Sequence, residues 1–333
     1  MSTFRRSTWN RPSMLVLAGA GVSGLAALVV AGPLDPPVGP VSASFKTLQQ
    51  VEPRIPLSDA TTPGNASFVY RITEPGSYYL TANVEGTLTK GGIEIAASGV
   101  TIDLNGFEVI GAGAQAGIRA ISSNYANAAV YNGTVRNWGG NGVDLNNISG
   151  SVVRDVVVAD CGGYGIAVNG GGLLSGCVAT GNGGTGMRVL NGSRAENCTA
   201  RANTGQGFYV TGAATISGCV STSNLWHGIE VGGDCVVTRN QVSNAGQGAA
   251  QAAGIYLTGN RNRCEENAVT TVSTAGGDQG IAISGSGNFV ARNTVSGYSA
   301  ASAFPMWGTH TVGPVVTATG TITTTNPWAN FVH

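Results

Sequence analysis

Side chains that could bind or act on a ligand recur along the middle of the chain at nearly constant spacing. They are a guanidinium, two phenols and a carboxylate, separated by 21, 21 and 26 residues: Arg188, Tyr209, Glu230 and Tyr256. An indole and an imidazole, Trp226 and His227, come shortly before the carboxylate. Aromatic rings stack on sugar rings, and guanidinium groups pair with carboxylates. This set therefore has the chemistry of a carbohydrate-binding surface, with Tyr209, Tyr256 and Trp226 as the predicted substrate-binding residues.

The same set contains candidates for catalysis, namely Glu230, His227 and Arg188. Hydrolysis of a glycosidic bond normally needs two carboxylates at a set separation, and only Asp234 lies near Glu230 in the sequence. A lyase needs a base and a cation that neutralises the substrate, roles open to His227 and Arg188. If the protein is an enzyme, we predict a polysaccharide lyase or a glycoside hydrolase. No metal ligands cluster nearby, and no metal or cofactor is predicted.

A purely structural interpretation of these residues is also available. An exposed column of a sheet can alternate charged and aromatic side chains because such pairs stabilise neighbouring strands. On that interpretation Arg188, Tyr209, Glu230 and Tyr256 pair with one another and bind nothing, and His227 is a turn residue.

Each of the four regularly spaced residues is the third residue of a repeated four-residue phrase, and the structure formed by this phrase must position them. A glycine, an apolar residue, a variable residue and a second apolar residue recur at a step of 21: Gly165-Ile166-Ala167-Val168, Gly186-Met187-Arg188-Val189, Gly207-Phe208-Tyr209-Val210 and Gly228-Ile229-Glu230-Val231. Apolar residues two apart share one face of a strand, and the variable residue points to the other face. The phrase therefore predicts short strands joined by tight turns, stacked as the coils of a parallel β-helix.

The phrase extends in both directions and predicts about nine coils, beginning at Gly92, Gly117 and Gly142 before the core and at Gly254 and Gly280 after it. Its variable residues form one outward column: Glu94, Arg119, Asp144, Ala167, Arg188, Tyr209, Glu230, Tyr256 and Ala282. The longer coils place extra residues at 244–253 and 270–279. These two segments are the predicted variable loops.

A second register runs in phase with the first. One column is predicted to hold Asp155, Cys177, Cys198, Cys219, Asn240, Asn267 and Asn293, and an inward apolar column three residues earlier begins with Val152 and Leu174. Asn182, Asn203 and Asn224 repeat five residues after the cysteines, and stacked asparagines can hydrogen-bond along a ladder. The six cysteines are predicted to be buried free thiols, because in-register stacking disfavours disulfide torsions.

The sequence Gly99-Val100-Thr101-Ile102-Asp103-Leu104-Asn105-Gly106-Phe107, followed by the repeated coils, resembles the right-handed parallel β-helix repeat family, whose fold pectate lyases and polygalacturonases share. The resemblance covers about residues 92–296. It implies that the variable loop and the strand after it frame a carbohydrate groove. The catalytic motifs of those enzymes are missing, except that Trp226-His227-Gly228 matches a Gly-His-Gly motif in part. We therefore interpret Asp103 as a structural turn residue.

The chain is predicted to have four parts: an export signal and Pro-rich spacer at 1–43, an N-terminal cap at 44–91, the β-helix at 92–296 and a C-terminal capping tail at 297–333. Arginines precede an apolar run at 14–31, and Val41-Ser42-Ala43 fits a cleavage site. The alternative is an uncleaved membrane anchor. A short helix is expected around Leu48, and strands at 68–72 and 78–81 in the cap. Trp328 and Phe331 are expected to close the far end.

The composition limits the kinds of function that this protein can have. Formal net charge is zero and 10% of residues are charged, which excludes the basic footprint of a nucleic-acid-binding protein. We predict a secreted, periplasmic or cell-surface protein that binds or processes polysaccharide, with membrane contact only through an uncleaved N-terminal segment. The alternative is a non-catalytic structural or cell-surface scaffold without glycan chemistry.

Overall fold

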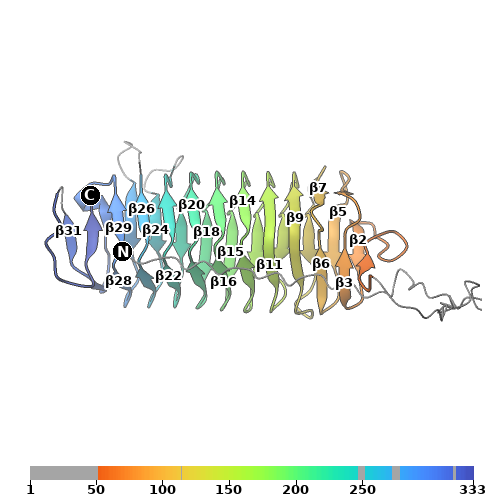
Figure 1. Cartoon of the computed structure of the whole chain (residues 1–333), viewed down its shortest axis with the longest axis horizontal. Coiled ribbons are helices and arrows are strands. Elements are labelled where there is room, and N and C mark those ends of the chain that lie inside the picture. The colour runs from red at the N-terminus through yellow and green to blue at the C-terminus, as the bar shows by residue number, and fades with distance from the viewer. Residues whose placement is uncertain (1–51, 114, 247–251, 272–277, 318–319) are drawn as a thin grey trace, which may run out of the picture. The chain divides into compact units, whose positions relative to one another are not determined.

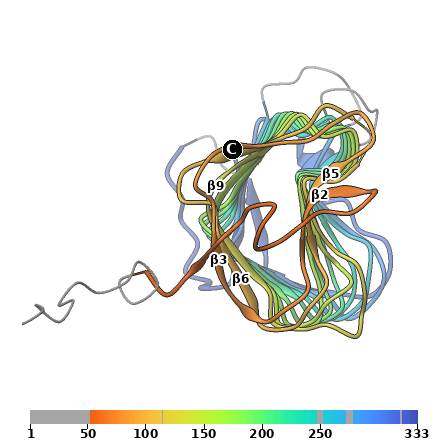
Figure 2. The same cartoon turned by 90° about the vertical axis from the view of Figure 1, so that its right-hand side faces the viewer.

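The computed structural model describes residues 52–113, 115–246, 252–271, 278–317 and 320–333. All of them belong to one compact unit, Leu48–His333. In this unit short parallel strands stack coil upon coil, from β2 and β3 at one end to β31 at the other (Figure 1). Seen along the stack, successive coils superpose (Figure 2). The predicted all-β solenoid is confirmed.

The predicted export signal and the short helix around Leu48 lie outside the described residues, as do most of the loop residues at 244–253 and 270–279. No helix in the described part of the chain has the length and apolar character needed to span a membrane.

Each coil contributes one strand to a ten-stranded parallel sheet. Its strands are β2 (Phe68–Ile72), β5 (Gly91–Ile95), β8 (Ile118–Ala120), β10 (Val143–Leu145), β12 (Ile166–Val168), β15 (Met187–Leu190), β18 (Phe208–Thr211), β21 (Ile229–Val231), β24 (Ala253–Leu257) and β27 (Gln279–Ile283). Nine of these strands are the nine repeated phrases, and β2 adds a coil before them. Together with the short strands at the C-terminal end, the described residues form about 11 turns of the solenoid.

The other two strands of each coil belong to a 22-stranded sheet that bends into two runs. The first run holds β1 (Ile55–Pro56), β3 (Gly76–Tyr79), β6 (Val100–Asp103), β13 (Leu173–Ser175), β16 (Arg194–Glu196), β19 (Thr215–Ser217), β22 (Val236–Thr238), β25 (Arg263–Glu265), β28 (Phe289–Ala291) and β30 (Thr311–Val312). The second holds β4 (Val84–Glu85), β7 (Glu108–Ile110), β14 (Val178–Thr180), β17 (Thr199–Arg201), β20 (Val220–Thr222), β23 (Gln241–Ser243), β26 (Ala268–Thr270), β29 (Thr294–Ser296), β32 (Asn330–Val332) and β31 (Val315–Thr317). Two long strands, β9 (Ala129–Arg136) and β11 (Val152–Ala159), pass through both runs.

Strand pairing places the inward residues of the phrase directly above one another. Ile166 pairs with Met187, Met187 with Phe208 and Phe208 with Ile229, and all four side chains are fully buried. The predicted stacking is confirmed, because the alternation of a strand sends each second side chain into the coil.

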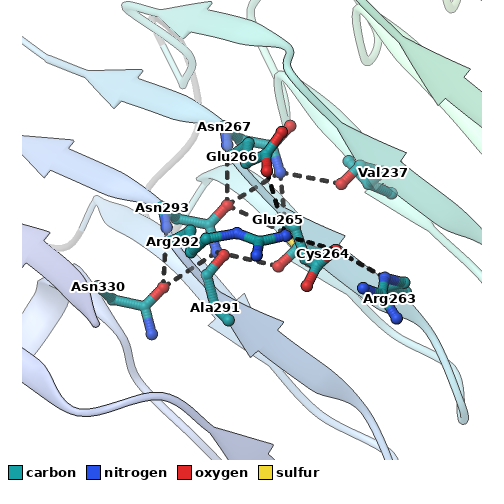
Figure 3. Close-up of polar contacts among 10 residues, drawn as sticks. All are labelled: Val237, Arg263, Cys264, Glu265, Glu266, Asn267, Ala291, Arg292, Asn293 and Asn330. Carbon is teal, nitrogen blue, oxygen red and sulfur yellow. Dashed lines mark hydrogen bonds and ion pairs between the residues drawn. The ribbon is translucent and has the colours of Figure 1, made fainter. Parts of the chain in front are cut away.

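A polar ladder crosses this apolar interior. Asn182 Nδ2 donates to Asn203 Oδ1 at 2.9 Å, and Asn203 Nδ2 donates to Asn224 Oδ1 at 2.9 Å. A second ladder runs through Asn240, Asn267, Asn293 and Asn330, the last three of which appear in Figure 3. Every amide is buried and hydrogen-bonded, so each asparagine satisfies backbone groups at a turn.

The predicted second register is wrong by one residue in the coil of β11. Val153 pairs with Leu174, and Val157 pairs with Val178, so Val156 lies level with Cys177. Asp155 occupies the bend between the two runs with a φ of 53°. Aspartate tolerates this left-handed conformation, which is unfavourable for a β-branched valine. Val156 is therefore buried in the core, and Asp155 is exposed.

All six cysteines are buried and unpaired, as predicted. The amide of Cys198 donates to Cys219 Sγ at 3.4 Å, so the Cys219 thiol accepts a hydrogen bond from the neighbouring coil. Burial raises the pKa of the Cys264 thiol to about 12, which keeps it protonated and unreactive.

At the two ends the chain continues the sheets. β2 pairs with β5 and β3 pairs with β6, so 68–79 builds a first coil under the repeats. Arg54 donates to Asp103 at 2.7 Å, and Asn132 also donates to this buried carboxylate, in agreement with its structural role.

At the C-terminal end a short helix, α2 (Ala300–Ala303), packs on β27. Phe331 lies in β32 and is paired with Thr294.

Candidate functional site

The four predicted ligand-facing residues lie on consecutive rungs of the ten-stranded sheet. Arg188 on β15 pairs with Tyr209 on β18, Tyr209 with Glu230 on β21, and Glu230 with Tyr256 on β24. All four side chains are half-buried. With a strand spacing of about 4.8 Å, they span about 14 Å of the outer face. We call these four residues, with Trp226, the sheet patch.

Arg188 is held between two aromatic rings. Its guanidinium carbon lies 4.5 Å from the centre of the Tyr164 ring and 5.7 Å from that of Tyr209. Among the described residues no carboxylate pairs with Arg188. Stacking of this kind orients a guanidinium while its N–H groups remain available to an acceptor.

The carboxylate of Glu230 is oriented by a short relay of side chains. Gln206 Nε2 donates to Glu230 Oε2 at 2.6 Å, and Thr185 Oγ1 donates to Gln206 Oε1 at 2.8 Å. The relay runs along the rungs beside the sheet patch and fixes which carboxylate oxygen is engaged. The other oxygen, Oε1, accepts no hydrogen bond from the described residues.

His227 lies beneath the surface and is only 6% exposed. Its Nδ1 accepts the amide hydrogen of Ala253 at 2.9 Å, so the ring proton sits on Nε2. The ring centre lies 5.1 Å from that of Trp226 and 4.9 Å from that of Tyr256. Trp226 is 41% exposed. His227 therefore supports the two aromatic rings that reach the surface.

Burial lowers the pKa of His227 to about 4, so the imidazole is neutral at pH 7. The unfolded chain, with an ordinary pKa near 6.5, takes up this proton between about pH 6.5 and 4, and the folded protein does not. We therefore expect the free energy of unfolding to fall by up to about 3 kcal/mol as the pH drops through this window. Denaturant titrations at a series of pH values would measure it.

The control for this prediction is a variant without a change of ionisable group. His227→Gln keeps an acceptor for the Ala253 amide and is expected to flatten the pH dependence between pH 6.5 and 4. Asn124→Ala, at an exposed position, is expected to leave it unchanged. An equal slope in the wild type and His227→Gln would contradict the assignment.

The structure places the second acid considered for hydrolysis in an ion pair of its own. Asp234 lies in the turn before β22, and both of its oxygens accept from Arg261, at 2.6 and 2.8 Å. Asp234 is therefore not free to act as the second carboxylate beside Glu230. Of the three predicted catalytic residues, Arg188 and Glu230 share the outer column, and His227 lies under the aromatic rings.

The outward column is less exposed than its alternation predicts. Glu94 is buried because Asn65 donates to it at 2.8 Å and Arg71 lies 3.1 Å away. Ala167 and Ala282 are also buried, since a methyl group is shielded by longer neighbours on the adjoining rungs. Arg119 is exposed and Asp144 is half-buried, so polar groups also reach the surface on earlier coils. Only the four consecutive strands from Arg188 to Tyr256 combine charged and aromatic side chains in this column.

Two residues that complete the patch are not among the predicted site residues. Tyr164 and Gln206 each immediately precede the glycine of a phrase, the position that His227 also occupies. The recurrence of this position was a signal that could have found them, because it places side chains alongside the outward column. Within the described ranges no three His, Cys, Asp or Glu side chains gather as a metal site would require.

Comparison with known proteins agrees with this architecture. Residues 91–235 match the family model described as a right handed beta helix region. A search of curated protein sequences finds no match. Among solved structures, the A-module of the mannuronan C-5 epimerase AlgE6 from Azotobacter vinelandii is similar, with a TM-score of 0.52 and 13% identity over 80% of this chain and 76% of that one.

A tailspike protein variant of E. coli bacteriophage HK620, solved in complex with a pentasaccharide, is also similar. Its TM-score is 0.54, with 12% identity over 80% of this chain and 54% of the tailspike. At such identities the likeness is one of fold, because a fold hosts many functions and each function depends on a site.

Proposed function

We propose that this chain, a right-handed parallel β-helix, binds a polysaccharide along the sheet patch of its ten-stranded sheet. The observation that carries the proposal is the unbroken register from Arg188 through Tyr209 and Glu230 to Tyr256. It aligns two aromatic rings, a carboxylate and a stacked guanidinium along the axis of the rod.

The patch is suited to an extended sugar chain. Aromatic rings supply apolar surface to the faces of sugar rings, while Arg188 and Glu230 offer a donor and an acceptor to hydroxyl or carboxylate groups. The side chains are also preorganised: Tyr164 holds Arg188, Gln206 holds Glu230, and His227 supports Trp226 and Tyr256. Preorganisation favours binding because less side-chain entropy is lost. Two of the proteins with a similar fold are a mannuronan C-5 epimerase and a tailspike in complex with a pentasaccharide, in accord with this class of ligand.

The geometry supports binding better than catalysis. The His227 Nδ1 is occupied, and its pKa of about 4 makes it a weak base at neutral pH. Glu230 lacks a second free carboxylate in Asp234, which is paired with Arg261. We therefore expect neither unsaturated nor reducing ends to be released from bound polysaccharides.

The test is binding to a panel of uronate and neutral glycans by the wild type and by Tyr209→Ala, Glu230→Gln and Tyr256→Ala. Each tyrosine replacement is expected to weaken binding about tenfold, since the loss of one stacking ring costs about 1.4 kcal/mol. Glu230→Gln is expected to change the ranking of charged against neutral glycans.

Tyr131→Ala is the matched control. Tyr131 on β9 also carries an arginine over its ring, Arg154 at 4.8 Å, but lies on the other sheet. Its replacement is expected to leave binding unchanged. Unchanged binding in all three patch variants would remove the patch from consideration and favour the rival function of a non-catalytic scaffold.

A further inference from the structure

A small pocket lies at the C-terminal end of the 22-stranded sheet, on rungs and a sheet that the proposed function does not use. Its volume is about 300 Å³, and its walls include Phe289, Thr311, Val312, Pro314, Asn326 and Trp328. Phe289 and Thr311 are register partners on β28 and β30, and the tail brings Trp328 back over them. Three segments, separated by 12 or more residues in sequence, thus line one space.

Two aromatic rings line this pocket. The rings of Phe289 and Trp328 meet edge to face, with centres 5.9 Å apart and planes inclined by 82°. Trp328 remains 44% exposed although it is packed against the sheet. Such a ring presents apolar surface to a ligand in water.

A network of ion pairs holds the rings in place. The guanidinium carbon of Arg292 lies 5.0 Å from the Trp328 ring centre, and that of Arg263 lies 5.2 Å from the Phe289 centre. Buried Glu265 accepts from Arg263 at 2.6 Å and lies 3.3 Å from Arg292, which also pairs with Glu266. Figure 3 shows Arg263, Glu265 and Arg292 side by side. The two aromatic rings of the pocket are therefore preorganised.

The charges beside the pocket cancel, since Arg263 and Arg292 are balanced by Glu265 and Glu266. The polar groups in its wall are neutral. Asn326 uses its Oδ1 to accept the amide of Trp328 at 2.9 Å, which leaves its Nδ2 as a donor, and the Thr311 hydroxyl is exposed. A ligand that suits these walls has one apolar face and a rim of hydroxyl groups.

We propose that this pocket binds a single neutral pyranose ring. The volume lies at the small end of ligand sites and suits one sugar unit. The C–H face of the ring packs on the exposed part of Trp328, Phe289 bounds the side of the pocket, and the sugar hydroxyls bond to Asn326 and Thr311. The pocket gives the rod a second sugar contact, independent of the sheet patch and on a different sheet.

The test uses the ¹⁵N-labelled full chain titrated with D-glucose, D-galactose and N-acetyl-D-glucosamine, and with D-galacturonate as the charged comparison. The expected result is a saturable shift of the Trp328 indole and of the Val312 amide with a neutral sugar, and weaker binding of galacturonate. Trp328→Ala is expected to weaken binding about tenfold, and Thr311→Val about threefold through one lost hydrogen bond.

Trp226→Ala, in the sheet patch, is the matched control and is expected to leave the pocket's affinity unchanged. Thr311 is exposed, so its variant retains the fold even where loss of Trp328 disorders the tail. Any one of three results would overturn the proposed pocket: shifts that do not saturate, equal affinity of Thr311→Val and the wild type, or loss of the response in Trp226→Ala. If only the sheet patch is wrong, the failure will appear in the polysaccharide binding experiment and not in this titration.

Discussion

Replacing Asn203 with alanine is expected to lower the free energy of unfolding by about 4 kcal/mol, because it removes four hydrogen bonds of buried groups at about 1 kcal/mol each. Asn203 Oδ1 accepts from the Asn182 amide at 3.0 Å and from Asn182 Nδ2 at 2.9 Å. Its own Nδ2 donates to Ala179 O at 3.2 Å and to Asn224 Oδ1 at 2.9 Å. Urea denaturation followed by circular dichroism would measure the change.

The control for this prediction is Asn124→Ala. Asn124 is exposed, and its replacement is expected to change stability by less than about 0.5 kcal/mol. Hydrogen exchange adds a spatial test, since contacts in a solenoid are made between neighbouring coils. Protection is expected to fall first in the rungs of Asn182 and Asn224. Equal stability of the Asn203 and Asn124 variants would mean that the ladder contributes nothing.

Phe208→Ala is expected to destabilise the protein by about 3 to 5 kcal/mol, through lost burial and the cavity left behind. Phe208 is fully buried and lies in register between Met187 and Ile229. The surrounding rungs are tied by backbone hydrogen bonds and cannot collapse onto the space. Thermal and urea unfolding of the variant would check the value.

The neighbouring residue on the same strand provides the control. Tyr209 follows Phe208 and points outward, so Tyr209→Ala is expected to cost less than about 1 kcal/mol of stability while weakening glycan binding. The two adjacent variants should therefore separate stability from binding. If Tyr209→Ala destabilised the fold as much as Phe208→Ala, the assignment of inside and outside on β18 would fail.

The outer column illustrates how far a candidate site can be predicted from sequence. The order Arg188, Tyr209, Glu230, Tyr256 follows from the step of the repeat, and the structure confirms that these residues are register partners. Their supporting residues do not follow from that step. Gln206 and Tyr164 precede the phrase, where the bend of the chain decides which way a side chain turns.

The fold was predictable because a parallel solenoid is specified by local alternation and by one repeat length. The stacking of Ile166 on Met187 requires only that consecutive coils carry the repeated phrase at the same place. The register failed at Asp155 because this coil is longer than the next one before its first run of strand. Val143 pairs with Ile166, 23 residues later, but Val153 pairs with Leu174, 21 residues later. The total length of a coil does not reveal where its extra residues lie.

The sequence by itself determined the repeat, the inward and outward columns and the asparagine ladders of this protein, because each depends on residues at fixed separations. Only the tertiary structure decided that His227 is buried, that Asp234 is paired with Arg261 and that Trp328 closes a pocket over Phe289. The physical reason is that burial and pairing depend on what packs over a side chain. Here the covering groups come from neighbouring coils and from a tail whose path no repeat specifies.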